Sequence, residues 1–565
     1  MSQDMSIVEK NQEDLMNDAK IRECWIKNVC DNDKYAKFKT KEIYDFIIVG
    51  AGTAGCVLAR ELINCIPNIN ILVLEAGGPD AHSNSLISLP CAFFKLAFLK
   101  TFQMNDNDWG YVTQEQRIPS LVDPTKEVVK EGLPYVRGKV WGGRGQAKEY
   151  NDWAAQDPEY NIWDWDHCLE AFKAVENNSR KNPDEKFKKF HGFDGLLHVQ
   201  DSYNGIYDVM SGLIDAAKNL GIPYNDDFNG ERQNGVGTYQ FTIKDGRRCS
   251  LAESYLKDAL KKVELHQDSK CGSFGKVAAV DVRSFAHVLN IIWDEENKEE
   301  NIAIGVKYFC NGTVREAFIA PKGEVILCGG AINSPQILML SGIGPKENLE
   351  SNNIKVRKEL PVGRNLLDHP GCCIFAKSTP NAIKHWKGIV DPSIEIYNKN
   401  SKFDGILIMP ILNIPSSVGY LELNSNNPFD KPKIHLNYFE KSDDLYRIIS
   451  SLKLCREILK QPPLSTTYNV KEIGINDEFG QWCTNGDDMS DEDWEKLIIK
   501  KALKMAPESK DGVVNHRLQV YGTKNLRAVD ASIFPFIPSG NTNAPTAMVA
   551  WRASRLIAED YMKLC

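Results

Sequence analysis

Three closely spaced glycines and one carboxylate are the first residues whose types and spacing could do chemistry. Residues 50–55 read Gly-Ala-Gly-Thr-Ala-Gly, after an apolar run and before a helical pattern. Glycines at this spacing let backbone amides approach a pyrophosphate at the positive end of a helix. Glu75 ends the next apolar run, 25 residues after Gly50 (75 − 50), where a carboxylate can accept hydrogen bonds from both ribose hydroxyls. Because it would repel a 2′-phosphate, the pattern predicts FAD or NAD rather than NADP. The alternative is a glycine-rich turn beside a surface glutamate.

A βαβ unit has to position these groups. The order of apolar and turn-forming residues predicts a strand at 46–49, a helix at 54–64 and a strand at 71–74. This arrangement places the glycine-rich turn at the carboxyl end of a strand, which is where open α/β sheets bind nucleotides. Further along, the same patterns predict a strand at 323–328, a helix around 334–341, and a strand, loop and helix within 526–562.

The composition is that of a large globular protein without a polyanionic partner. With 565 residues, of which 42% are hydrophobic and 25% charged, the chain is too long for one simple core. The formal charge of −8 provides no basic surface, so we expect no nucleic acid as a partner. Fifteen cysteines without a CxxC pair indicate reduced thiols, with neither a metal site nor a disulfide framework.

No segment of the sequence is typical of export or of membrane insertion. Residues 1–40 are interrupted by charged and amide side chains, and they predict a polar arm rather than a secretory signal. The most apolar window, 89–99, contains Lys95 and is shorter than the about 20 residues that span a bilayer. The sequence therefore predicts a cytoplasmic protein that has no transmembrane helix and no membrane partner.

Four parts of the chain resemble, in the same order, the glucose-methanol-choline (GMC) oxidoreductase family. The first comprises residues 45–59 with 74–78, and the second, at 330–344, reads GAINSPQILMLSGIG. The third is VGRNLLDHP at 362–370, and the fourth is the C-terminal stretch that comprises 529–535 with 539–546. The resemblance extends from residue 41 to the end of the chain. It implies FAD rather than NAD as the cofactor, because the C-terminal stretch has a role only with a flavin.

The resemblance also implies a fold class and a domain organisation. The expected fold is α/β, with an FAD-binding Rossmann-like (GMC-type) domain interleaved with a shortened α+β substrate domain. After the polar arm at 1–40, FAD-binding parts are expected at 41–150, 246–370 and 501–565. The substrate domain would take most of 151–245 and the shortened segment 371–500.

Cofactor-binding roles follow from the resemblance, residue by residue. The first glycine turn and Glu75 would hold the ADP half, Val288 would contact the adenine, and the C-terminal residues would lie near the pyrophosphate and the isoalloxazine. Two residues have structural alternatives, because Val288 also fits an ordinary strand core position and Asp530 fits a helix or turn cap. The full implied set is Gly50, Gly52, Thr53, Ala54, Gly55, Glu75, Ala76, Gly142, Gly143, Val288, Asp530, Ala531, Asn541 and Thr542.

The reaction implied by the resemblance is alcohol oxidation, with a small alcohol as substrate and oxygen or an unknown group as electron acceptor. A base takes the hydroxyl proton while a hydride leaves the carbon for flavin N5. Asn543 matches the second position of the family's catalytic pair. Its amide can hydrogen-bond the substrate oxygen but cannot act as a base at neutral pH. The alternative is a loop-ordering amide without substrate contact.

Three departures from the family pattern affect the expected chemistry. The family's histidine stretch should precede residues 504–507, but no His occurs between Trp494 and Asn515. His516 is the nearest His, and its position matches a family residue remote from the flavin. The segment that covers the flavin face is missing after Gly143, and the stretch 371–403 is shorter than in the family.

These departures leave three hypotheses open. The first is an FAD-dependent oxidoreductase that acts on CH–OH donors and draws its missing contacts from elsewhere in the chain. The second is a non-catalytic flavin-binding pseudoenzyme or interaction protein that keeps the fold. The third is a transcript that lacks coding segments at the two catalytic positions. Removing a general base costs about 10² to 10⁴ in rate, so the first hypothesis predicts a slow enzyme.

Overall fold

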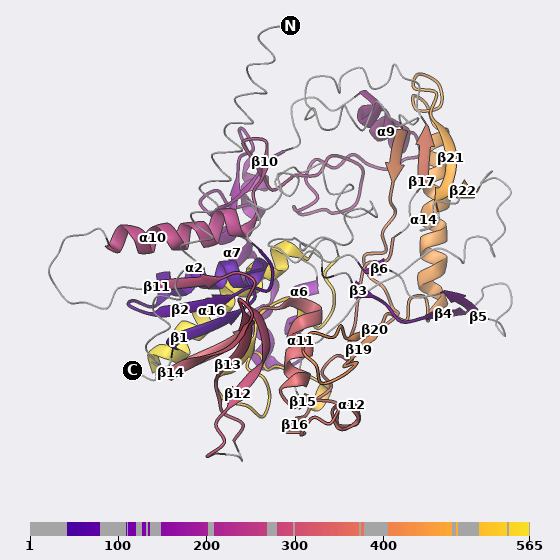
Figure 1. Ribbon diagram of the computed structural model, residues 1–565. Coiled ribbons are helices and arrows are strands. Elements are labelled where there is room, and N and C mark those ends of the chain that lie inside the picture. Colours follow the sequence, from indigo (N-terminus) through magenta and orange to yellow (C-terminus); the bar gives the residue numbers. More distant parts are fainter. Residues whose placement is uncertain are drawn as a thin grey trace, which may run out of the picture.

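The computed structural model describes residues 42–78, 109, 111–119, 127–130, 134–135, 149–201, 208–267, 279–297, 300–371, 374–377, 405–476, 482–483, 508–539 and 542–563. The largest sheet has seven strands in the order β11-β2-β1-β14-β13-β12, with β23 beside β14 (Figure 1). Its strands are β1 (Glu42–Val49), β2 (Asn70–Leu74), β11 (Ala279–Arg283), β12 (His287–Trp293), β13 (Ala303–Cys310), β14 (Thr313–Leu327) and β23 (Leu526–Ala528).

This sheet combines a parallel part with an antiparallel edge. β1 pairs in parallel with β2 and β14, and β11 and β23 extend the parallel part. β12 and β13 run antiparallel. β14 has two neighbours on one side, β13 along residues 313–318 and β23 along residues 325–327. The carboxyl ends of β2, β1, β14 and β23 therefore meet at one edge of the sheet, and the expected α/β class is confirmed.

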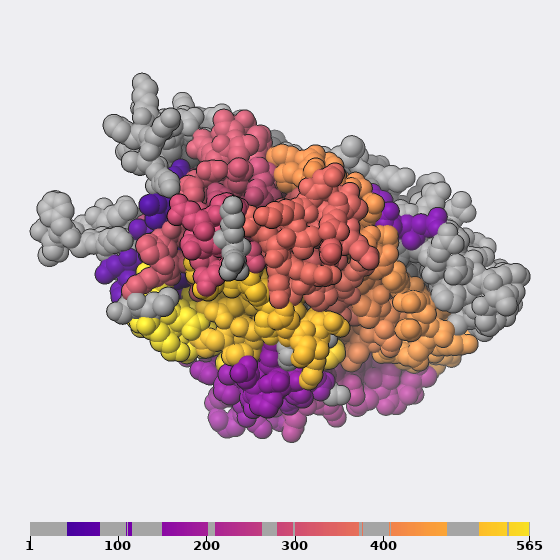
Figure 2. Space-filling model, turned by 90° about the horizontal axis from the view of Figure 1, so that it is seen from below, coloured from indigo at the N-terminus to yellow at the C-terminus, as the bar shows by residue number. Residues whose placement is uncertain are grey.

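Helices pack against the parallel strands, and the strands are therefore buried on both faces. Phe46, Ile47 and Ile48 of β1 have no exposed surface, as continuous apolar runs in parallel sheets require. α16 (Asn543–Lys563) packs against α2 (Thr53–Cys65) and α7 (Trp165–Val175), and α11 (Gly330–Leu340) packs against β12. Figure 2 shows the C-terminal residues, in yellow, between the purple segment that contains α7 and the red segments of the sheet domain.

A second hydrophobic core lies beside the first. It is built on α14 (Ser442–Lys460), α9 (Asp208–Asn219) and a four-stranded sheet, which appear to the right in Figure 1. The sheet has the order β18-β17-β21-β22 and comprises β17 (Ile374–Lys377), β18 (Gly405–Ile408), β21 (Lys471–Asn476) and β22 (Trp482–Cys483). Tyr111 and Ile332, from segments expected in the FAD-binding domain, belong to this second core. The domain boundaries given above remain a prediction.

The remaining described strands form two-stranded sheets. The remaining strands are β3 (Tyr111–Val112), β4 (Gln116–Pro119), β5 (Glu127–Lys130), β6 (Pro134–Tyr135), β7 (Glu176–Asn178), β8 (Leu197–Val199), β9 (Ile243–Lys244), β10 (Arg247–Arg248), β15 (Ile343–Gly344), β16 (Lys358–Glu359), β19 (Tyr420–Glu422) and β20 (Lys433–His435). The remaining helices are α6 (Glu149–Ala154), η3 (Pro158–Trp163), α8 (Glu185–Phe190), η4 (Ala252–Leu256), α10 (Lys257–Gln267), α12 (Lys346–Ser351), η7 (Glu508–Lys510) and η8 (Ala531–Ile533).

The sequence predicts no transmembrane helix and no metal site, and the structure bears on both predictions only within the described residues. In that part of the chain, no helix combines the length and the apolar character needed to cross a bilayer. The same residues contain no cluster of His, Cys, Asp and Glu that could hold a metal ion. The polar arm at 1–40 lies outside the described residues.

A buried histidine links two carboxylates outside the main sheet. His191 is 1% exposed, and its Nδ1 lies 2.9 Å from Glu176 Oε1 while its Nε2 lies 3.2 Å from Asp227 Oδ1. Its ring also stacks on Phe187, with the centroids 3.9 Å apart. Burial alone would lower the pKa of His191, but the hydrogen bonds to Asp227 and Glu176 raise it to about 9.

We expect the free energy of unfolding to depend on His191 at alkaline pH. When His191 is protonated, its pairs with Glu176 and Asp227 stabilise the folded state. Because the pKa of His191 is raised from 6.5 to about 9, this stabilisation is complete below pH 6.5 and is lost as the pH rises through 9. The loss should be on the order of 1–3 kcal/mol, measured by urea unfolding at several pH values. In the His191→Gln variant, whose amide does not titrate, the decrease over this interval should disappear. A decrease of equal size in wild type and variant would contradict the assignment.

Candidate functional site at the carboxyl edge of the sheet

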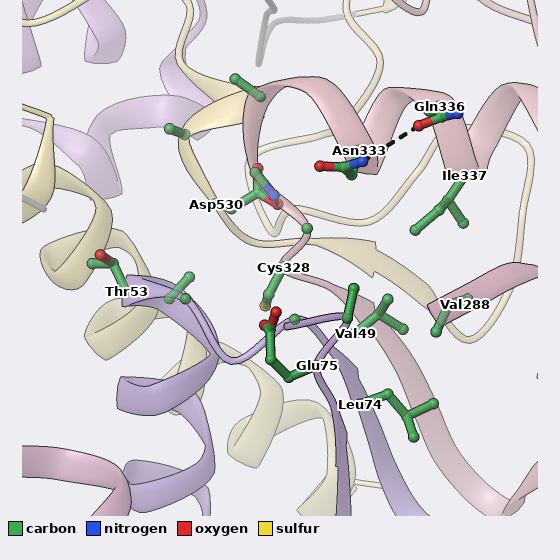
Figure 3. Close-up of a pocket in the computed structure, with 18 of the residues that line it drawn as sticks. Val49, Thr53, Leu74, Glu75, Val288, Cys328, Asn333, Gln336, Ile337 and Asp530 are labelled. Atoms are coloured by element: carbon green, nitrogen blue, oxygen red, sulfur yellow. Dashed lines mark hydrogen bonds between the residues drawn. The ribbon is translucent and has the colours of Figure 1, made fainter. Parts of the chain in front are cut away.

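A cavity of about 310 Å³ lies where the carboxyl ends of four parallel strands meet. It is lined by residues at or just beyond the ends of β2, β1, β14 and β23, and Figure 3 shows several of them around its centre. The start of α11 and the start of α16 complete the wall. The predicted residues that line this cavity are Gly50, Gly52, Thr53, Ala54, Glu75, Ala76, Val288, Asp530, Ala531, Thr542 and Asn543.

The three glycines of the first turn are required for three different reasons. Gly50 has φ +109°, and a Cβ there would lie 2.4 Å from the carbonyl oxygen of Cys328 on the adjacent turn. A Cβ on Gly55 would lie 1.9 Å from the carbonyl oxygen of Gly50, inside the turn itself. A Cβ on Gly52 would meet no atom within 4 Å. Since Gly52 lines the cavity, any side chain there would project into the space that a ligand needs.

Backbone amides hold the carboxylate of Glu75 in place. Its Oε2 accepts a hydrogen bond from Ala51 N at 2.8 Å, and its Oε1 accepts one from Gly77 N at 2.7 Å. The side chain is buried at the edge of the cavity. Each carboxylate oxygen has a second lone pair, so both can still accept hydrogen bonds from ligand hydroxyls.

Asp530 is a cap and a cavity residue at the same time. It caps η8 by accepting a hydrogen bond from Ser532 N at 2.7 Å. Its second oxygen accepts hydrogen bonds from Gly330 N at 2.8 Å and from Ser334 Oγ at 2.6 Å. Asp530 therefore joins the end of β23 to the start of α11, and the capping alternative from the sequence holds alongside its position in the cavity wall.

Three helices begin at this cavity. Residues in the first turns of α2, α11 and α16 all belong to its lining. Helix N-termini carry partial positive charge and favour a ligand with negative charge. At α11 this end already faces the carboxylate of Asp530, which accepts a hydrogen bond from Gly330 N, so the starts of α2 and α16 remain for such a ligand. Sequence reasoning missed the second turn, Cys328 to Gly330, as a part of the site. Its signal was present, because two glycines there separate a predicted strand from a predicted helix.

Asn543 is buried and hydrogen-bonded at the start of α16. Its Oδ1 accepts a hydrogen bond from Thr53 Oγ1 at 2.8 Å, and Thr53 is the first residue of α2. The contact joins residues 490 positions apart in the chain. Since the Thr53 hydroxyl donates to Oδ1, the Nδ2 group of Asn543 keeps both of its N–H donors for other partners.

Val288 lies on β12 and is both a buried core residue and part of the cavity wall. Its neighbour His287, together with Trp109 and Pro428, also lines the cavity. These three residues were absent from the sequence-based set, since their proximity depends on contacts between distant parts of the chain.

Several predictions from the sequence cannot be placed. Gly142, Gly143 and Asn541 lie outside the described residues, as do the segments where the sequence departs from the family at Gly143 and before 504–507. His516 is described and does not line the cavity. Its Nδ1 lies 3.2 Å from Glu159, and its carbonyl oxygen accepts a hydrogen bond from Trp163 Nε1.

The carboxylates among the described lining residues are engaged in hydrogen bonds, and the thiol among them is buried. Glu75 and Asp530 already accept hydrogen bonds from backbone amides. Burial raises the pKa of the Cys328 thiol well above its usual value, so it stays protonated. His287 lies on β12 beside Val288, and its Nε2 is 3.1 Å from the carbonyl oxygen of Pro428.

The cavity fits a dinucleotide. The open space above Gly52 admits a pyrophosphate, the N-termini of α2 and α16 favour its charge, and Glu75 offers acceptors for ribose hydroxyls. The lining also includes Asp530, Thr542 and Asn543 from the C-terminal stretch, which the resemblance associates with flavin binding.

Comparison with known proteins gives a consistent result along nearly the whole chain. The N-terminal part of the family described as GMC oxidoreductase matches residues 44–371, and its C-terminal part matches residues 415–550. An alcohol dehydrogenase [acceptor] of Pseudomonas putida is 30% identical, over 91% of this chain and 96% of the relative. An oxygen-dependent choline dehydrogenase of Vibrio vulnificus is 31% identical, over 91% of this chain and 94% of the relative.

Solved structures show the same fold. The structure of an Aspergillus oryzae formate oxidase variant superposes with a TM-score of 0.75 at 20% identity, over 93% of this chain and all of that one. Pyridoxine 4-oxidase superposes with a TM-score of 0.70 at 21% identity, over 91% of this chain and 98% of the other. With two family matches that together span most of the sequence, the chain belongs to the GMC oxidoreductase family of FAD-dependent enzymes that act on CH–OH donors.

Proposed function

We propose that the protein binds FAD in the cavity at the carboxyl edge of the sheet and oxidises the CH–OH group of a small alcohol. The observation that carries this proposal is the convergence on one cavity of Gly52 and Glu75, from the N-terminal βαβ unit, with Asp530 and Asn543, from the C-terminal part of the chain. The names of the relatives, which refer to alcohols and to choline, support a small alcohol as donor. They also support oxygen or another acceptor for the electrons.

Each group of residues has a proposed role. The turn at Gly50 to Gly55 and the start of α16 bind the pyrophosphate, and Glu75 with Ala76 binds the ribose of the ADP half. Asp530 fixes α11 against β23, and Ala531 and Thr542 lie along the flavin half. The bound flavin supplies a hydride acceptor to the reaction.

Asn543 is the residue that we propose to orient the substrate. Thr53 holds its Oδ1, so its Nδ2 can donate a hydrogen bond to the alcohol oxygen. This bond positions the carbon for hydride transfer, which requires a near-attack distance. An amide does not accept the proton, so Asn543 serves as a hydrogen-bond donor and not as the base.

A second candidate function is flavin binding without turnover. It is supported by the lining residues themselves, since Glu75, Asp530 and Cys328 are each engaged or protonated and His287 lies at the Val288 end. Under this alternative, the fold and the cofactor are kept and the alcohol chemistry is lost.

One experiment separates the two functions. The purified protein is examined by visible absorption under anaerobic conditions, with and without a panel of small alcohols that includes choline and benzyl alcohol. We expect flavin peaks that bleach slowly with at least one alcohol, and heat denaturation should release FAD. Flavin peaks that no alcohol bleaches would favour the non-catalytic alternative. Release of NAD instead would contradict the cofactor assignment.

We expect the rate of any alcohol oxidation to show no sigmoid rise near neutral pH. A titrating histidine base produces such a rise near its pKa of about 6.5, but no His lies between Trp494 and Asn515, and Asn543 does not titrate. The measurement is kcat/KM from pH 5 to 9. Fast turnover with a clear transition near pH 6.5 would contradict this prediction, and His287, which lines the cavity, would be the first residue to replace.

A further inference from the structure

A group of exposed apolar side chains lies on the second core, at the start of α14. Four of them belong to the loop 409–418, between β18 and β19, and the fifth is on α14. α14 appears at the right in Figure 1, whereas the main sheet lies at the left. The group, which we call the apolar face, is 37% to 53% exposed and consists of Met409, Ile411, Ile414, Val418 and Tyr446.

The start of α14 holds this loop in one shape. Asp444 is fully buried, and its two carboxylate oxygens accept hydrogen bonds from Ser416 N at 2.8 and 2.9 Å. Oδ2 also accepts one from Ser417 N at 2.7 Å. Arg447 Nη1 donates to the carbonyl oxygen of Ile414, also at 2.7 Å. The backbone of the loop is therefore fixed to the helix that carries Tyr446.

The beginning of the loop is fixed as well. Ile411 forms an antiparallel bridge with Gly371, and Leu412 N donates to the carbonyl oxygen of Pro370 at 2.8 Å. The Leu412 side chain is buried in the second core, so the neighbouring Ile411 is left on the outer side. Single exposed apolar residues are ordinary, but a group of them on a rigid surface marks an interaction site. A rigid surface also loses little conformational entropy when it binds.

Charges of both signs surround the apolar face. Glu440 and Asp443 are exposed acids, and Lys441 and Arg447 are bases at the same end of α14. With the buried Asp444, which lies 3.7 Å from Arg447, the local excess is one negative charge. The whole chain carries −8, so two copies repel each other in general. They can approach most easily where apolar side chains are surrounded by charges that nearly cancel.

We propose that the apolar face is the surface through which two copies of this chain associate. In a two-fold dimer the same surface lies against itself, so the mixed rim lets an acid of one copy meet a base of the other. The apolar side chains then form the centre and the charges form the rim, as in other homodimers. An anionic membrane surface would instead require an excess of Lys and Arg, whereas these rim residues include as many acids as bases.

The test is the mass of the full chain in solution, measured by analytical ultracentrifugation at micromolar concentrations. We expect the wild type to sediment with about twice the chain mass of 63.6 kDa. Ile414→Glu places a carboxylate in the apolar centre, where it loses its water and approaches its counterpart in the other copy. The dissociation constant of the dimer should rise at least about hundredfold, which leaves a monomer.

Tyr446→Ala is a second variant, at an exposed helix position that accepts alanine without loss of helix propensity. Aromatic residues at the centre of an interface contribute strongly to binding, so we expect the dissociation constant to rise at least about tenfold. Ile414→Val keeps an apolar side chain and should remain dimeric.

Val314→Glu is the matched control. Val314 is also β-branched and is 58% exposed, but it lies on β14 of the main sheet. This variant should remain dimeric although it receives the same charge as Ile414→Glu. Circular dichroism and thermal unfolding establish that each variant is folded before its mass is compared with that of the wild type.

Three outcomes would overturn the proposal: a monomeric wild type, folded Ile414→Glu and Tyr446→Ala proteins that remain dimeric, or a Val314→Glu protein that dissociates to the same extent. A monomeric wild type that binds phosphatidylcholine vesicles through Ile414 would assign the face to a membrane surface instead. The inference goes beyond the proposed function and does not depend on a bound flavin. Its failure would therefore leave the alcohol-bleaching experiment unaffected, and a flavin that no alcohol bleaches would leave the dimer unaffected.

Discussion

The Gly52→Val variant should purify as a folded protein that carries no FAD. A Cβ on Gly52 meets no protein atom within 4 Å, so the fold can accept the side chain. The same open space belongs to the cavity, and the valine methyl groups would occupy the path of the pyrophosphate. We expect loss of the yellow colour and at least a hundredfold weaker binding of FAD, measured by flavin fluorescence.

Gly55→Ala is the matched control for this prediction. A Cβ there lies 1.9 Å from the carbonyl oxygen of Gly50, so this variant should lose stability and not only cofactor. Circular dichroism and thermal unfolding distinguish the two cases. A yellow Gly52→Val protein, or one that is as unstable as Gly55→Ala, would show that the open space at Gly52 is not the pyrophosphate site.

The largest expected loss of stability comes from Arg527→Met. Arg527 lies on β23 and is 1% exposed as a side chain. Its guanidinium donates to both carboxylate oxygens of Glu324 and to Asp560 Oδ2, at distances of 2.6 to 2.9 Å. Removing one partner of a buried ion pair costs about 3–5 kcal/mol, since the remaining charges lose their compensation. We expect a decrease of this size in the free energy of unfolding, measured by urea denaturation.

Glu559 provides a control for the change at Arg527. It lies 3.3 Å from Arg517, and its side chain is 56% exposed. Exposed ion pairs contribute about 0–1 kcal/mol, so Glu559→Ala should leave stability almost unchanged. Similar losses in the two variants would indicate that the network around β23 is not the source of the effect. Because α16 carries Asp560 near one end and Asn543 at the other, Arg527→Met should also weaken FAD binding.

The sequence predicted those parts of the site that depend on short-range patterns. The turn at Gly50 to Gly55, the strand before it and Glu75 lie within one βαβ unit, where spacing alone indicates the geometry. The α/β class and the family followed from motifs that occur in the same order along the chain. Asp530 and Val288 could each be interpreted in two ways, and the structure shows that the capping and core positions also line the cavity.

The remaining parts of the site depend on contacts between distant segments, which a single sequence does not contain. The turn at Cys328 to Gly330 reaches the cavity only because β14 pairs in parallel with β1. Trp109, His287 and Pro428 meet through side-chain packing between two cores. Their residue types carry no nucleotide motif, so no pattern in the sequence distinguishes them from ordinary core residues.

The wide separation of the strands that form the cavity edge has a consequence for synthesis of the protein. β1 ends at Val49 and its partner β14 at Leu327, whereas β23 ends only at Ala528. A ribosome that adds about 5–20 residues per second needs roughly 14–56 s to advance from β1 to the end of β14, and roughly 24–96 s to reach the end of β23. Until β14 has left the exit tunnel, one edge of β1 has no partner, which is a condition that favours aggregation. We therefore expect the nascent chain to depend on chaperones through most of its translation, and FAD to associate tightly only after its release.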